Sequence, residues 1–212
     1  MYMDINYRTL NGNAYPISVY IKKIHYDEID YDYERVTNWC KTGCRNYGHS
    51  GGCPPLAPHF NSITWDKNQY YLIIAVFDSK YKTEKVRQCS NRAIHWKFQD
   101  AILARFMYRL GEQLVNSFGG HFLATGYCMG CPGQKCAIKT GKPCRNVQRR
   151  TFSMEATGIN VINTVQKVFH RRFYWYHKNF IEVPYMMKCI LYNGAVGMNA
   201  DDLLFEVDKF FK

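Results

Sequence analysis

The order of apolar and polar residues along the chain predicts a core built from strands and helices. Residues 14–25 alternate loosely between apolar and polar side chains, which is typical of a half-buried strand. Residues 70–77 (YYLIIAVF) are apolar throughout, as in a strand that is covered on both faces. Further strands are predicted over residues 121–127 and 182–192, and Pro184 favours a strand start or a sheet edge for the latter.

A single long helix is predicted over residues 82–118, because large apolar side chains recur there at every fourth position from Ile94 onward. Steps of four drift by about 40° per repeat on a helix of 3.6 residues per turn. The apolar stripe therefore winds round the helix, and we expect much of its circumference to be buried. The glycine pair at 119–120 ends this helix. Shorter helices are expected over residues 161–169 and 200–211.

Buried strands that alternate with helices indicate an α/β protein, with a compact sheet, flanking helices and one domain over residues 1–212. With 212 residues, 47% of them hydrophobic, the chain is long enough to bury a core without the help of disulfides. It shows no apolar run long enough to span a bilayer and no signal peptide. We therefore expect a cytoplasmic protein without membrane contact, whose thiols are reduced and free to bind metal.

Seven of the nine cysteines fall into two groups. The second group (Cys128, Cys131, Cys136 and Cys144) lies in the second cysteine segment, residues 128–150, with the spacing C-x2-C-x4-C-x7-C. Four thiolates so close in sequence can converge on one metal centre. Structural zinc commonly uses two C-x2-C pairs, whereas a short run with one outlier is typical of iron–sulfur ligands. We predict a [4Fe-4S] cluster here, with zinc or unmetallated thiols as the alternatives.

The first group (Cys40, Cys44 and Cys53) lies in the first cysteine segment, residues 40–58, and is one thiolate short of a closed four-ligand site. Three cysteines can hold a [4Fe-4S] cluster whose fourth iron stays open to a substrate as a Lewis acid. They can also be merely reduced thiols in a loop. Other residues that could complete the ligand set are Cys89, His49, His59 or a residue from elsewhere in the chain.

Basic residues outnumber acidic ones by 28 to 17, which gives a formal net charge of +11. A basic surface suggests an anionic partner such as nucleic acid, a nucleotide cofactor or an acidic protein. A solvated surface rich in lysine explains the charge equally well. The aromatic run of Tyr174, Trp175 and Tyr176 could stack bases, but we favour a place in the core or in an interface.

Glu155 is the acidic residue that follows the second cysteine segment most closely. It could act as an acid–base group, but we favour an ion pair with Arg149 or Arg150. These arginines, together with Arg145, could bind phosphate or stabilise thiolate charge beside an anionic cluster. Cys189 lies in an apolar segment and is expected to be a small buried residue.

Several motifs follow one another along the chain. They are Cys40-x3-Cys44 with Tyr47-Gly48, then Cys53-Pro54-Pro55, then the second group ending in Cys144-Arg145, and finally residues 153–161 (SMEATGINV). Together they resemble the family of predicted metal-binding, cysteine-rich proteins, a domain of unknown function that is frequent in anaerobic bacteria and archaea. The resemblance extends roughly over residues 35–165. It implies iron–sulfur binding in an anaerobic cytoplasm and supplies no reaction.

The sequence therefore predicts an iron–sulfur protein with one or two [4Fe-4S] clusters that acts in redox or sulfur-transfer chemistry on a small substrate. It leaves open whether the protein is an enzyme. One alternative is a non-catalytic electron carrier or maturation partner, which would bind a redox partner protein. Another is a zinc-stabilised basic module that binds nucleic acid.

Overall fold

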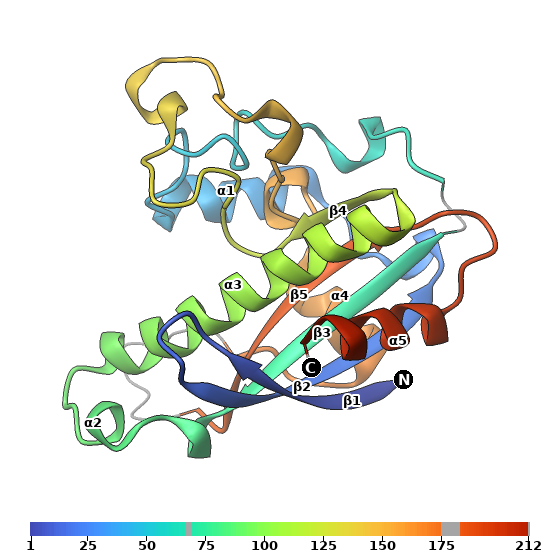
Figure 1. Ribbon diagram of the computed structural model, residues 1–212. Coiled ribbons are helices and arrows are strands. Elements are labelled where there is room, and N and C mark those ends of the chain that lie inside the picture. The colour runs from blue at the N-terminus through green and yellow to red at the C-terminus, as the bar shows by residue number, and fades with distance from the viewer. Residues whose placement is uncertain (67–68, 175–182, 212) are drawn as a thin grey trace.

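Five strands form one sheet in which every neighbouring pair is antiparallel, as a computed structural model shows for residues 1–66, 69–174 and 183–211 (Figure 1). The strand order is β1-β2-β3-β5-β4. The expected α/β class, with helices flanking one sheet, is confirmed, although the sheet contains antiparallel pairs only. The strands are β1 (Tyr2–Arg8), β2 (Ala14–Ile24), β3 (Tyr70–Asp78), β4 (His121–Ala124) and β5 (Tyr185–Asn193).

Helices cover both faces of this sheet. α3 and α5 pack on one face, where they share a core with β1, β2, β3 and β5. α4 packs on the opposite face, and α1 lies beyond β4 with the two cysteine segments (Figure 1). The helices are α1 (Tyr33–Gly43), α2 (Glu84–Arg87), α3 (Arg92–Phe118), α4 (Val161–Phe169) and α5 (Ala200–Phe211).

Strand β3 is the centre of the core. Its residues from Tyr70 to Phe77 are all buried, as the continuous apolar run predicts. Alternate side chains point to opposite faces of a strand, so Tyr71 and Ile73 pack under α3 and α5 while Leu72 and Ile74 pack under α4. The two helical layers explain why the strand needs no polar face.

One predicted helix is divided in the structure, and one strand is not predicted. The helix predicted over residues 82–118 is two helices, because the chain leaves the helical path after α2 and restarts at Asn91. The Asn91 side chain accepts a hydrogen bond of 3.0 Å from the Ala93 N–H and thus caps α3. The pattern of residues does not predict β1, since only Ile5 and Tyr7 of this strand are buried.

The last predicted strand begins at Tyr185, directly after Pro184. β5 lies between β3 and β4, so proline marks the start of an inner strand and not a sheet edge. Of the aromatic run, Trp175 and Tyr176 lie outside the described residues, as does residue 182 of the predicted strand. Among the helices that the structure describes, none combines the length and the apolar character that a membrane span needs.

The packing of α5 on the sheet can be tested with two substitutions in that helix. Leu203 is fully buried in the core, whereas the Phe205 side chain is 71% exposed. We expect Leu203→Ala to lower the free energy of unfolding by about 2–5 kcal/mol, because it leaves a cavity. Phe205→Ala should change it by less than about 0.5 kcal/mol. Urea unfolding at fixed metal content measures both, and equal losses would contradict this packing.

Candidate metal site

The two cysteine segments lie side by side at the end of the molecule that carries α1 and β4 (Figure 1). Gly52 of the first segment packs directly against the second. A Cβ atom on Gly52 would lie 2.2 Å from the Thr151 carbonyl oxygen and 2.9 Å from the Cys128 Cβ. Only glycine fits at this contact, which therefore brings the two cysteine groups close together.

Hydrogen bonds reinforce this contact between the segments. The Ser153 N–H donates to the Gly52 carbonyl oxygen at 2.9 Å. Arg150 donates from Nε to the Gly51 carbonyl oxygen at 2.7 Å and from a terminal nitrogen to the Leu56 carbonyl oxygen at 2.9 Å. A planar guanidinium donates hydrogen bonds in fixed directions. Arg150 therefore connects the loop around Cys53 to the second segment.

The first cysteine group is built on α1 and the loop after it. Cys40 lies in the last turns of α1, and Cys44 follows as its C-cap residue, whose N–H donates to the Cys40 carbonyl oxygen at 3.0 Å. Asp32 fixes the other end of α1 by accepting a hydrogen bond from the Arg35 N–H. Cys53 lies in a turn and is almost fully buried.

All three cysteines of the first group line one cavity of about 800 Å³. Polar and charged side chains, among them Glu155 and Lys188, also line this cavity. The Lys188 Nζ lies 2.9 Å from an Asp100 carboxylate oxygen, and both side chains are largely buried. The cavity thus combines three thiols with a set of charged groups. Aromatic side chains that also line it are Trp39, Trp96, Tyr127, Phe173 and Tyr174.

Burial keeps two thiols of this group, those of Cys40 and Cys53, in the neutral form. Burial, together with the Glu155 carboxylate, raises the pKa of Cys40 to about 12 and the pKa of Cys53 to about 11. A thiolate must form before a metal can bind, and a bound cation supplies the positive charge that makes the thiolate stable there. The three thiols of the group line one cavity and form a donor set that fits a metal centre.

The second cysteine group lies on irregular backbone that contains two short 3-10 helices, Ala137–Thr140 and Val147–Arg149. The Gly130 N–H donates to the Cys128 sulfur at 3.5 Å. The first group contains a matching bond, since the Asn46 N–H donates to the Cys44 sulfur at 3.5 Å. Backbone donors that point at sulfur stabilise negative charge on it and tune the potential of iron–sulfur clusters.

The ligand sets of both groups stay predictions. Within the three described ranges, no three His, Cys, Asp or Glu side chains come close enough together to hold a metal ion. Of the residues considered as a fourth ligand of the first group, none is among the described residues that line its cavity. The His59 ring stacks on Tyr33, with centroids 3.5 Å apart, and Cys89 lies between α2 and α3.

The predicted ion pair between Glu155 and an arginine is wrong. Arg149 binds Glu112 with two hydrogen bonds of 2.8 and 2.6 Å, and Arg150 is engaged by carbonyl oxygens. Glu155 instead accepts a hydrogen bond of 2.5 Å from the Ser153 hydroxyl. Burial raises the pKa of Glu155. The sequence relates Glu155 to the second cysteine segment, which it follows, whereas the structure places it on the cavity lined by the first cysteine group.

Cys189 is fully buried, as expected, and its sulfur lies 3.7 Å from the Met154 sulfur. It belongs to the core under α4 and lies on the same strand as Lys188. It is therefore a core residue next to the cavity floor and not part of either cysteine group.

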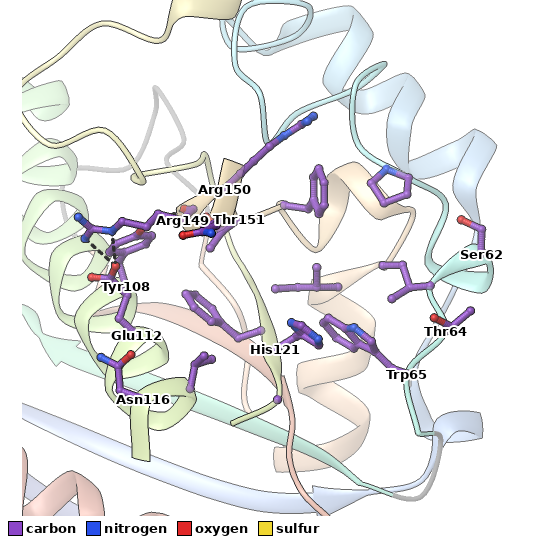
Figure 2. A pocket seen from close by; sticks show the side chains of 18 residues that line it. Ser62, Thr64, Trp65, Tyr108, Glu112, Asn116, His121, Arg149, Arg150 and Thr151 are labelled. Carbon is purple, nitrogen blue, oxygen red and sulfur yellow. Dashed lines mark hydrogen bonds and ion pairs between the residues drawn. The ribbon is translucent and has the colours of Figure 1, made fainter. Parts of the chain in front are cut away.

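A second cavity of about 470 Å³ lies beside β4 and the end of the second segment (Figure 2). Its wall contains the ion pair of Arg149 and Glu112, and the Tyr108 hydroxyl donates to the Arg149 carbonyl oxygen at 3.1 Å. On the opposite side the Trp65 and His121 rings stack nearly in parallel. These contacts join the second segment to α3 and hold it in place.

The fold and the site define a cysteine-rich protein in which an antiparallel α/β scaffold presents two groups of thiols at one end. The chain belongs to the family described as "Predicted metal-binding protein (DUF2284)", whose sequence model matches residues 22–191. This confirms the resemblance and supports a metal cofactor without specifying the metal. Neither the curated proteins nor the solved structures contain a match.

The close contact at Gly52 can be tested against a second glycine of the same segment. We expect Gly52→Ala to push the Thr151 backbone and Cys128 away, and so to lower both the metal content and the thermal midpoint of unfolding. At Gly43 an added Cβ has no atom within 4 Å, so Gly43→Ala should fold and bind metal normally. Metal analysis and thermal unfolding of both variants measure this, and a normal Gly52→Ala protein would contradict the contact.

Proposed function

We propose that this protein is a cytoplasmic iron–sulfur protein that carries one or two [4Fe-4S] clusters and acts in redox or sulfur-transfer chemistry on a small substrate. The observation that carries this proposal is the cavity lined by Cys40, Cys44 and Cys53. Its volume of about 800 Å³ falls in the range of pockets that enclose small molecules. A metal site with a purely structural role needs no such cavity beside its ligands.

The first group supplies three thiolates, which can hold three irons of a [4Fe-4S] cluster. The fourth iron would then face the cavity and supply Lewis-acid or redox chemistry to a bound molecule. Aromatic side chains form part of the cavity lining, and a lining of low polarity strengthens electrostatic interactions inside it. The ion pair of Lys188 and Asp100 provides a polar contact for the substrate at the cavity floor.

The second group supplies four thiolates and would close its cluster completely. A closed cluster is suited to moving electrons or to holding the fold, since no iron is open to substrate. The contact of Gly52 with Cys128 brings the two cysteine groups close together, so clusters bound by both groups would be neighbours. Neighbouring clusters could pass electrons to and from the cavity, so the arrangement favours redox chemistry over a single structural metal.

The metal can be identified by anaerobic purification with visible absorption and with iron, sulfide and zinc analysis. We expect a brown protein that absorbs near 400 nm, with about eight irons and eight sulfides for two clusters. About four of each would support one cluster and leave the other group as thiols or a mononuclear site. A colourless protein with stoichiometric zinc would contradict the redox proposal and favour nucleic-acid binding, which is strongly dependent on salt.

The assignment of ligands can be tested with one serine substitution in each group. We expect Cys40→Ser to lower the iron content by up to about four atoms through loss of the first cluster, and Cys128→Ser to do the same for the second. Cys89→Ser is the control, because Cys89 belongs to neither group, and it should keep its full iron content. A Cys89→Ser protein that loses as much iron as the other two variants would contradict the assignment.

A further inference from the structure

Glu155 lies on a segment that contacts both α1 and the loop around Cys53. It begins the short 3-10 helix Glu155–Thr157, which packs against α1. The Asp32 N–H donates to the Gly158 carbonyl oxygen at 2.9 Å, just before α1 begins. Gly158 has a φ of 95°, and a Cβ on it would lie 2.7 Å from the Tyr33 Cα. The backbone at Gly158 therefore lies so close to the start of α1 that a side chain on this residue would not fit.

The backbone before Glu155 is fixed on the other side. Ser153 donates its N–H to Gly52, the residue next to Cys53. Met154 donates its N–H to the Ala124 carbonyl oxygen of β4 at 2.9 Å. Glu155 thus stands between the helix that carries Cys40 and the loop that carries Cys53, on backbone that is anchored at both ends.

Burial raises the pKa of Glu155, and Lys188 is the cation that acts on its carboxylate and lowers this pKa. Among the residues that the structure describes, Glu155 forms no ion pair, and Lys188 is bound to Asp100. Its hydrogen-bond donor is the neutral Ser153 hydroxyl. A carboxylate that is half-buried near thiols and shares its nearby cation with Asp100 gains stability when a further cation joins the group.

We propose that Glu155 is the fourth protein ligand of the metal site formed by Cys40, Cys44 and Cys53. Among the described residues that line the cavity, the carboxylates are those of Glu155 and Asp100, and Asp100 is already paired with Lys188. The inference rests on the proposed function, since it requires metal in this site. It completes the set of four ligands that the first cysteine group lacks.

A carboxylate ligand is suited to a metal site that binds a substrate. Carboxylate oxygen is a harder donor than thiolate and binds iron–sulfur clusters less firmly. It therefore protects the fourth position while no substrate is present and yields to a softer donor such as a thiol or sulfide. This names the substrate class: molecules that bind through sulfur.

The test uses the full chain with its clusters, purified anaerobically. In Glu155→Gln the amide is a weaker ligand, so a simple thiol such as 2-mercaptoethanol should bind with a dissociation constant about tenfold lower than in the wild type. The electron paramagnetic resonance spectrum of the reduced protein should also change, at unchanged iron content. Glu155→Cys should supply a fourth thiolate and abolish the spectral response to added thiol.

Glu84→Gln is the matched control, because Glu84 lies in α2 and is paired with Arg87, away from the cavity. It should reproduce the wild-type spectrum and thiol affinity. A Glu155→Gln protein that does the same, with wild-type iron at the first site, would overturn the ligand role and leave the proposed function intact. A wild-type protein without metal at the first site would overturn both.

Discussion

The crowded backbone contact between Gly52 and residues 151–153 determines the arrangement of the whole cysteine-bearing end. The contact leaves no room for a side chain at Gly52. A hydrogen bond from the Ser153 N–H to the Gly52 carbonyl oxygen stabilises it. Through it the first cysteine segment is tied to the second, and through Ala124 both are tied to the sheet. Two loops that lack regular structure thereby gain the rigidity of the scaffold, which preorganised ligands require.

The charged side chains of the cysteine-bearing end have different partners in the cavity and in the second segment. The cavity collects thiols and carboxylates, whereas the arginines of the second segment bind Glu112 or backbone carbonyls instead of the thiols. Arg45 and Lys188 line the same cavity, so protein cations balance part of this negative charge. A metal bound by the thiols would add to that balance, so metal binding and folding of this end should be linked. The net charge of +11 is a property of the outer surface and says little about this interior.

The core could be predicted from the sequence, because apolar periodicity reports burial directly. The apolar run of β3 and the amphipathic α4 are found where the pattern placed them. The break before Asn91 escaped prediction, since a capping side chain interrupts a helix without interrupting its apolar stripe. The grouping of cysteines by spacing was visible as well. The place of Glu155 was not, because it depends on hydrogen bonds to residues about thirty and one hundred positions away along the chain.

Both ends of the described chain lie on the side of the molecule opposite the cysteine segments (Figure 1). β1 and α5 meet there, where the Tyr7 and Phe211 rings are 5.7 Å apart. A surface tether attached at either end would therefore hold the protein with its thiols turned away from the support. Such an orientation is convenient for attaching the molecule to a bead or a chip, with the cavity accessible to dissolved reagents.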